Sequence, residues 1–287
     1  MSKLSDLSVL FHAWGLESRY SSTKLCGLVK CYAVNIETEE ELLGKLPLPS
    51  EWYWEKAKEE ILEAKDLGLS CITIFDKAYP SCLSDIDDAP MVLFVMGGVV
   101  GTPFNSVERC YAIVGARRPT MYGEFVAKDL GKGLCNLGIT VVSGLAMGID
   151  RRAHEGSLNG SATVPTIAVL GSGLLEIYSS LSSDLIEEIV DKGGLVVSEY
   201  GLREPSRAYL FPRRNRIISA LSSSVVIVEA EERSGSLITA RLALEQNRDV
   251  YAVPGPIDSK LSNSPLLTAA NSKNLEKFSI FRTKASA

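Results

Sequence analysis

Arginine is concentrated in one short part of the chain, around residues 211–222, which read FPRRNRIISALS. Residues 203–216 hold five arginines and one glutamate, although the 287-residue chain carries a net charge of −5. A guanidinium group donates two parallel hydrogen bonds to a phosphate or a carboxylate. The overall acidity therefore conceals a basic segment with the chemistry of an anion site.

A helix is expected to follow this segment. Pro212 suits the first position of a helix, because its φ is preset and it has no N–H to leave unpaired. Such a helix would hold Arg213 and Arg216 one turn apart on one face. Ile217 and Leu221 would then point toward a core.

The second part of the chain alternates short apolar runs with helical patterns. Strands that are apolar on both faces, each followed by a helix, predict a mainly parallel sheet covered on both sides. The predicted fold class is therefore α/β, with an extended Rossmann-like, doubly wound sheet. The expected strands lie at residues 111–116, 140–144, 166–171, 195–200, 224–230 and 249–255.

Small and basic residues recur after these strands. In an open parallel sheet, ligands bind beyond the carboxyl ends of the strands, where Gly- and Ser-rich turns lead into helix N-termini that favour anions. This edge is the predicted binding site. Its candidate residues are Gly115, Arg117, Arg118, Ser143, Gly144, Gly148, Phe211, Arg213, Arg214, Asn215, Arg216, Ser234, Gly235, Ser236 and Lys260.

Several polar and aromatic residues near this edge allow two interpretations. Asp150, Glu199 and Glu229 could be catalytic carboxylates, but helix caps and ion pairs to the nearby arginines are favoured. His154 has no clear acidic or cysteine partner, so a structural role is favoured. Phe211 beside Pro212 is either a hydrophobic staple or a stacking surface.

The spacing of the glycines bears on the kind of anion. Neither VGARRPTMYG nor VSGLAMGID has the GxGxxG spacing of a dinucleotide site. A basic rim that runs across several strands fits an extended polyanion better than one dinucleotide. An exposed aromatic ring at this rim would offer a stacking surface to unpaired bases.

The first third of the chain differs in character. Residues 1–105 carry 9 basic and 16 acidic residues, whereas residues 106–287 carry 21 and 19. Helical periodicity covers residues 3–17 and 51–66, with Ser50 as the expected N-cap of the second helix. The Gly- and Pro-containing stretch before residue 106 predicts a boundary between a small helical domain, 1–105, and the Rossmann-like domain, 106–287.

Composition excludes other classes. No stretch is long and apolar enough to span a bilayer, and the N-terminus lacks the pattern of a signal peptide, so a cytoplasmic protein without membrane contact is expected. The six cysteines form no CxxC pair and the chain has two histidines. We therefore expect free thiols, with no metal site and no cofactor.

Six motifs in order resemble the DNA-processing protein A family, also called DprA or Smf. They are VGARRPTMYG, VSGLAMGID followed by AH, SEY, FPRRNRIISALS, VVIVEA followed by RSGSLITARLALE, and VYAVPG. The upstream stretch AYPSCLSDIDDAPMVLFVMG, residues 78–97, also resembles the passage that precedes this domain in the family.

The resemblance implies a sterile-alpha-motif-like helical domain before the Rossmann-like one. It implies a non-catalytic protein that binds and protects single-stranded DNA and loads RecA during natural transformation and recombination. Arg117 would then bind backbone phosphate, the glycine turns would let the strand approach, and Phe211 would stack on a base. Arg213, Arg214 and Arg216 would line the pocket with Asn215, and residues 234–236 would offer backbone donors.

The resemblance also implies a homodimer formed through the C-terminal part of the Rossmann-like domain. Residues 261–272 depart from the family pattern there, and no C-terminal winged-helix domain is expected. Two other functions stay open. One is a nucleotide-binding or nucleoside-monophosphate-hydrolysing enzyme of a related Rossmann-like family, and the other is an interaction module whose basic rim is merely solvated.

Overall fold

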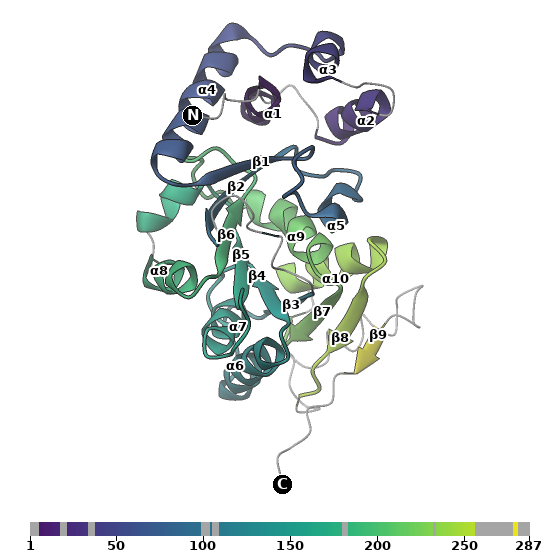
Figure 1. Ribbon diagram of the computed structural model, residues 1–287. Helices are drawn as coiled ribbons and strands as arrows, with labels where there is room; N and C mark the ends of the chain where they lie inside the picture. Colours follow the sequence, from purple (N-terminus) through teal and green to yellow (C-terminus); the bar gives the residue numbers. More distant parts are fainter. Residues whose placement is uncertain are drawn as a thin grey trace.

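The computed structural model describes residues 6–17, 22–33, 38–98, 104, 109–179, 183–231, 234–255 and 278–280. These residues form one nine-stranded sheet in the order β1-β2-β6-β5-β4-β3-β7-β8-β9 (Figure 1). The strands are β1 (Ser70–Thr73), β2 (Val92–Gly97), β3 (Cys110–Gly115), β4 (Thr140–Ser143), β5 (Thr166–Val169), β6 (Leu195–Ser198), β7 (Ser224–Val228), β8 (Asp249–Ala252) and β9 (Phe278–Ile280).

The sheet is mainly parallel. All neighbours from β6 to β9 run in the same direction, and β2 and β1 add an antiparallel pair at the β6 edge. Every residue of the central strands β4, β5, β6 and β7 is buried. Their continuous apolar runs follow from this two-sided burial, as the sequence predicted.

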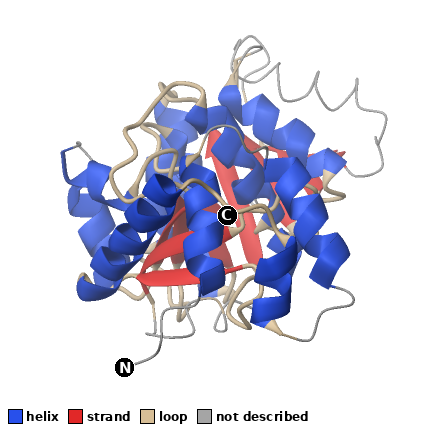
Figure 2. Cartoon of the chain, turned by 90° about the horizontal axis from the view of Figure 1, so that it is seen from above, coloured by secondary structure: helices blue, strands red, loops and turns tan. Residues whose placement is uncertain are grey.

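Helices cover both faces of the sheet (Figure 2). The side chain of Ile113 on β3 packs in a core with residues of α6 and α7, whereas those of Ala112 and Val114 belong to the core that includes α9 and α10. Alternate residues of one strand thus serve different helices. The helices of this part are α6 (Met121–Asn136), α7 (Ile149–Ser157), α8 (Ser183–Asp191), α9 (Leu210–Ala220) and α10 (Gly235–Glu245).

The N-terminal part is helical, as expected. It comprises α1 (Asp6–Leu16), α2 (Ser22–Ala33), α3 (Glu39–Lys45), α4 (Glu51–Asp66) and the short α5 (Ser81–Ser84). Helix α1 packs against α4, and both helices contact β1 (Figure 1). Ser50 occupies the N-cap of α4, although its side chain makes no capping hydrogen bond.

The α/β fold class predicted from the sequence is confirmed, with local differences. Helix α9 begins at Leu210 rather than at Pro212, which lies inside its first turn. The sequence pattern also predicts one helix over residues 178–191, where the structure has a short 3₁₀ helix, Leu174–Ser179, followed by α8. The pattern predicts a short terminal helix after residue 255 as well, and that segment lies outside the described residues.

The division at residues 105 and 106 stays a prediction, and the sheet continues across it. Strands β1 and β2 precede this point in the sequence, yet β2 pairs with β6 over four residues. Within the described ranges, we find no helix with the length and hydrophobicity that crossing a bilayer requires.

Candidate functional site

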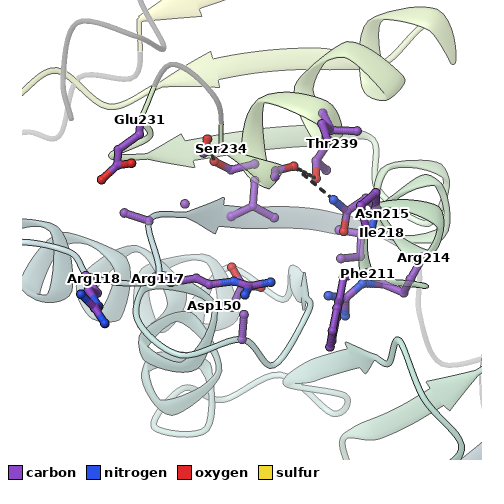
Figure 3. Close-up of a pocket in the computed structure, with 18 of the residues that line it drawn as sticks. Arg117, Arg118, Asp150, Phe211, Arg214, Asn215, Ile218, Glu231, Ser234 and Thr239 are labelled. Carbon is purple, nitrogen blue, oxygen red and sulfur yellow. Dashed lines mark hydrogen bonds between the residues drawn. The ribbon is translucent and has the colours of Figure 1, made fainter. Parts of the chain in front are cut away.

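A cavity of about 630 Å³ opens at the carboxyl ends of β3, β4 and β7. Strands β3 and β7 are neighbours, but the helix after β3 covers one face of the sheet and the helix after β7 covers the other. The loops diverge at this switch point and leave a crevice. Nine of the predicted site residues line it: Gly115, Arg117, Arg118, Phe211, Arg214, Asn215, Ser234, Gly235 and Ser236 (Figure 3).

The loop after β3 carries two exposed cations, Arg117 and Arg118. It is held at Thr120, whose hydroxyl caps α6 by accepting a hydrogen bond from the N–H of Gly123 at 3.2 Å. The carboxylate of Glu229 accepts from the Thr120 N–H at 2.8 Å and from its hydroxyl at 2.5 Å. The end of β7 therefore fixes the loop that presents both arginines.

Glu229 reaches this position at a conformational cost. It is buried, with φ of 55°, in the left-handed region that non-glycine residues rarely adopt. A Cβ at Gly123 would lie 2.5 Å from its carboxylate, so a side chain at this helix position would require the carboxylate to move. Glu229 thus clamps the loop by holding Thr120, the N-cap of α6, whereas the sequence favoured a direct cap or an ion pair to a nearby arginine.

Phe211 forms one wall of the cavity beside Arg117. The Arg117 guanidinium lies 5.5 Å from the centroid of the Phe211 ring, within reach of a cation–π contact. The same ring passes close to Gly171, where a Cβ would be 2.9 Å from it. Phe211 is half-buried, so part of the ring stays available to the cavity.

Arg214 is the buried cation of the site, with 4% of its surface exposed. Its Nη1 donates to the carbonyl oxygens of Gly144, at 2.8 Å, and of Val169. Burial lowers the pKa of Arg214 to about 10, against the attraction of Asp150, so the group is charged at neutral pH. Figure 3 shows Arg214 and Arg117 reaching the cavity from different elements.

Asp150 supplies the opposing charge. Its carboxylate accepts from the N–H of Gly144 at 3.2 Å and lies near Arg214. Burial raises the pKa of Asp150, while Arg214 and backbone donors act in the opposite direction. His154 is fully buried and pairs its Nδ1 with the Thr166 hydroxyl at 2.7 Å, which agrees with the structural role favoured from the sequence.

The start of α10 forms the third wall. Ser234, its N-cap, pairs its hydroxyl with that of Ser236 at 2.7 Å. Asn215 donates to the carbonyl of Gly235 at 3.1 Å and thereby ties α9 to α10. The positive end of the α10 dipole lies at this first turn and favours negative charge in the cavity.

Two of the clustered arginines lie elsewhere. Arg216 is 3% exposed and ion-paired to Glu199 at 2.6 Å and to Asp88 at 2.9 Å, so it serves the interior. Burial by itself would raise the pKa of Glu199. The attraction and hydrogen bonds of Arg216 are the main opposing cause, and the pKa of this carboxyl is lowered overall. Arg213 lines a second cavity. The expectation of one pocket lined by all three arginines is therefore corrected, because successive residues of a helix face different directions.

Further candidates have internal roles. Ser143 is fully buried and donates to the carbonyl of Ile113 at 2.6 Å. A Cβ at Gly115 would clash with the Val228 carbonyl, and one at Gly144 with Arg214. Gly148 has φ of 84°. These residues are needed for packing or backbone conformation, a different reason from the strand approach that the resemblance implied, and Lys260 lies outside the described residues.

Sequence reasoning did not assign some lining residues to the site. Glu231 and Thr239 both line the cavity, and Thr239 follows Gly235 by one helical turn. That i, i+4 spacing could have signalled a shared face. Arg151 and Arg152, which also follow a strand, are ion-paired to Glu155. Within the described part of the chain, no group of three His, Cys, Asp or Glu side chains could hold a metal ion.

Fold and site together define a Rossmann-like α/β protein whose switch-point cavity combines three arginines with an aromatic ring. The chain belongs to the family described as DNA recombination-mediator protein A, whose model matches residues 70–276. The resemblance seen in the sequence motifs is confirmed by this match.

Several relatives are similar over most of this chain. Protein Smf of Escherichia coli is 45% identical over 65% of this chain and 48% of its own length. DNA processing protein DprA of Bacillus subtilis is 38% identical over 75% of this chain and 71% of its own length. The matched part thus spans about half the length of the E. coli protein and about seven-tenths of the B. subtilis protein.

Two solved structures are similar to this fold. The DprA structure from Streptococcus pneumoniae has a TM-score of 0.68 at 32% identity and covers 91% of this chain and 92% of its own. The DprA structure from Helicobacter pylori, described by its single-stranded DNA binding mode, has a TM-score of 0.62 at 29% identity. This match covers 71% of this chain and 89% of that structure's chain.

Proposed function

We propose that this chain binds single-stranded DNA at the switch-point cavity. The observation that carries the proposal is the convergence of Arg117, Arg118 and Arg214 with the ring of Phe211. Cations contact phosphates and an aromatic face stacks on bases of any sequence. The proposal is supported by the H. pylori relative, which is described as binding single-stranded DNA.

The exposed and the buried arginines of the cavity have different roles in this proposal. Arg117 and Arg118 are exposed and contact phosphates directly, so each contributes to the salt dependence of binding. Arg214 is already hydrogen-bonded to two carbonyls and balances Asp150. It shapes the floor of the cavity and adds positive potential, while Phe211 takes a base against its free face.

The finer role follows from the family. We propose that binding protects incoming single strands and that the complex then loads RecA, as the resemblance implies for natural transformation and recombination. The protein would act in the cytoplasm as a homodimer. Sedimentation tests the dimer, and RecA assembly on a strand precoated with this protein tests the loading step.

The central experiment measures the anisotropy of a labelled oligo-dT at several salt concentrations. Arg117→Ala should weaken binding at low salt and reduce the slope of log K against log salt by about 0.7, the value for one phosphate contact on a single strand. Lys132→Ala is the matched control, because it removes one exposed positive charge at the other end of α6.

An unchanged slope in Arg117→Ala, with affinity equal to that of Lys132→Ala, would contradict the proposed contact. An assay of base release from a nucleoside monophosphate tests the enzyme alternative. Asp150 and Glu231 are the carboxylates of the cavity that such an enzyme could use, whereas Glu245 is exposed at the last residue of α10 and does not line the cavity.

A further inference from the structure

A second cavity, of about 420 Å³, lies between α1 and the loop that joins β6 to α9. Its walls include residues from the N-terminal helices, from the stretch before β2 and from the start of α9. The side chains that matter for its chemistry are Phe11, Trp14, Tyr200, Arg207, Tyr209 and Arg213.

The two cavities share one wall. Residues 207–213 run between them, and their side chains divide between the two sides. Ala208, Phe211 and Pro212 line the switch-point cavity, while Arg207, Tyr209, Leu210 and Arg213 line the second one. A polymer bound in the first cavity would reach the second after crossing this single ridge.

The second cavity offers aromatic surface near the ridge. Tyr209 is 60% exposed, and its hydroxyl accepts from Arg207 at 3.1 Å. Trp14 is buried, with its indole N–H donating to the carbonyl of Pro47 at 2.9 Å, yet it lines the cavity wall. The exposed ring of Tyr209 suits a nucleobase, and Trp14 lies in the same wall as a buried neighbour.

The charges of the lining also fit a nucleotide. Its cations are Lys56, Arg207 and Arg213, and its carboxylates are Glu17, Glu199 and Glu204. Each carboxylate has an internal partner: Arg216 for Glu199, Arg207 for Glu204 at 3.6 Å, and the N–H of Ser50 for Glu17 at 3.4 Å. The three cations of the lining thus match its three carboxylates in number, and Glu199 is already neutralised by Arg216 from outside the lining, so a phosphate is tolerated.

Three ion pairs hold the elements around the second cavity, and one of them joins an N-terminal helix to the Rossmann-like part. Glu63 on α4 pairs with Arg203, and Arg216 on α9 pairs with Asp88 before β2. The buried His12 on α1 lies 2.6 Å from Glu60 on α4. The buried pairs thus hold α1 to α4 and α9 to the stretch before β2, so that part of the cavity wall is preformed, as in most ligand sites.

We propose that this second cavity is a nucleotide subsite that receives a later nucleotide of the single strand held at the switch point. The proposal rests on the proposed function of the first cavity. The strand would cross the ridge at Phe211 and Tyr209, stack a base on Tyr209 and contact Arg213 through a phosphate. The N-terminal part of the chain would thereby share in DNA binding.

Trp14 allows a direct test in the full-length chain. Trp52→Phe and Trp54→Phe leave Trp14 as the only tryptophan. This variant is titrated with oligo-dT of increasing length, from about 4 to about 16 nucleotides, the range that such sites cover. We expect Trp14 fluorescence to change only above a threshold length, at which the affinity also rises.

Substitutions on the second-cavity side of the ridge separate this subsite from the first cavity. Tyr209→Ala should abolish the rise in affinity above the threshold, a loss of about five- to hundredfold, while short oligonucleotides bind as before. Tyr209→Phe keeps the ring and should bind like the wild type. Arg213→Ala should weaken only the longer strands, with Lys132→Ala as the charge-matched control.

The outcomes distinguish the two proposals. If no oligonucleotide binds, both fail. If short strands bind through Arg117 but Tyr209→Ala and Arg213→Ala match the wild type at every length and Trp14 emission never changes, only the second subsite is overturned. If dTMP alone changes Trp14 emission as strongly as a long strand, the cavity binds a free nucleotide, and the assignment to the strand is overturned.

Discussion

The contact between Glu229 and Gly123 allows a prediction in which one substitution has opposite effects in two backgrounds. Glu229 holds Thr120 through two hydrogen bonds, and its carboxylate occupies the space that a Cβ at Gly123 would need. Glu229→Ala removes both hydrogen bonds and leaves the Thr120 N–H without this acceptor. Since hydrogen bonds to a charged group contribute about 1.5–3 kcal/mol each, we expect the free energy of unfolding to fall by about 3 kcal/mol.

Gly123→Ala is the second half of the test. In the wild-type background the new Cβ must displace the carboxylate and weaken at least one of these bonds, so we expect a net loss of about 1 kcal/mol. In the Glu229→Ala background the space is empty, and alanine is favoured over glycine in a helix by about 0.5–1 kcal/mol. Gly123→Ala should therefore stabilise that variant.

Urea unfolding of the four proteins, followed by circular dichroism, measures both effects as a double-mutant cycle with a coupling of about 2 kcal/mol. Glu229→Gly is a useful companion: it loses the same contacts but relieves the left-handed φ, so it should exceed Glu229→Ala in stability by about 1 kcal/mol. If Gly123→Ala has the same sign and size in both backgrounds, the clamp does not act as described. Oligo-dT affinity should fall with Glu229→Ala, because Arg117 and Arg118 lie on the loosened loop.

Three other predictions concern two buried ionisable side chains and one glycine turn. Burial lowers the pKa of His154 to about 3, from about 6.5. The unfolded chain therefore binds a proton at His154 below pH 6.5 that the folded chain does not bind, and stability is lost as the pH falls toward 3. Between pH 6.5 and 5 the free energy of unfolding should drop by about 2 kcal/mol. Urea unfolding at both pH values measures this, and an equal drop in His154→Gln would assign it to other groups. Arg214→Met leaves Asp150 buried without its cation and should cost about 3–5 kcal/mol, part of which Asp150→Asn should recover; no recovery in the double variant would show that the two charges are not coupled. Gly148→Ala forces a side chain into φ of 84° and toward the carbonyl of Ala116, and should cost more than about 2 kcal/mol in thermal or urea unfolding; a cost near zero would mean that the turn readily takes another conformation.

The sequence could predict the fold class because its signal is local. Runs such as VVIV in β7, residues 225–228, are apolar at every position, and only a strand covered on both faces requires this. The apolar runs at residues 71–75 and 91–97 also predict two extended pieces, but they do not predict that β2 pairs with β6, because the two strands are about a hundred residues apart. Helix limits were predicted to within a few residues, as with α4, predicted and found at residues 51–66.

The binding site was predicted only in part. That Arg117 and Arg214 meet follows from topology: in a parallel sheet, residues that follow different strands converge on one edge. Which of the clustered arginines face that edge did not follow. Arg216 turns inward because Glu199 and Asp88, supplied by distant segments, meet its guanidinium there.

The amino-acid sequence by itself determined the alternation of buried strands and helices, the edge at which glycines and arginines gather, and the family to which the motifs point. Only the tertiary structure decided which arginines form ion pairs with internal carboxylates and how Glu229 fixes the loop that carries Arg117 and Arg118. It also decided that residues 207–213 form a wall common to two cavities. The physical reason is the distance along the chain over which each kind of interaction acts. Periodicity and turn chemistry act between neighbours in the chain, whereas the burial and pairing of a charge depend on groups brought together only when the sheet is complete.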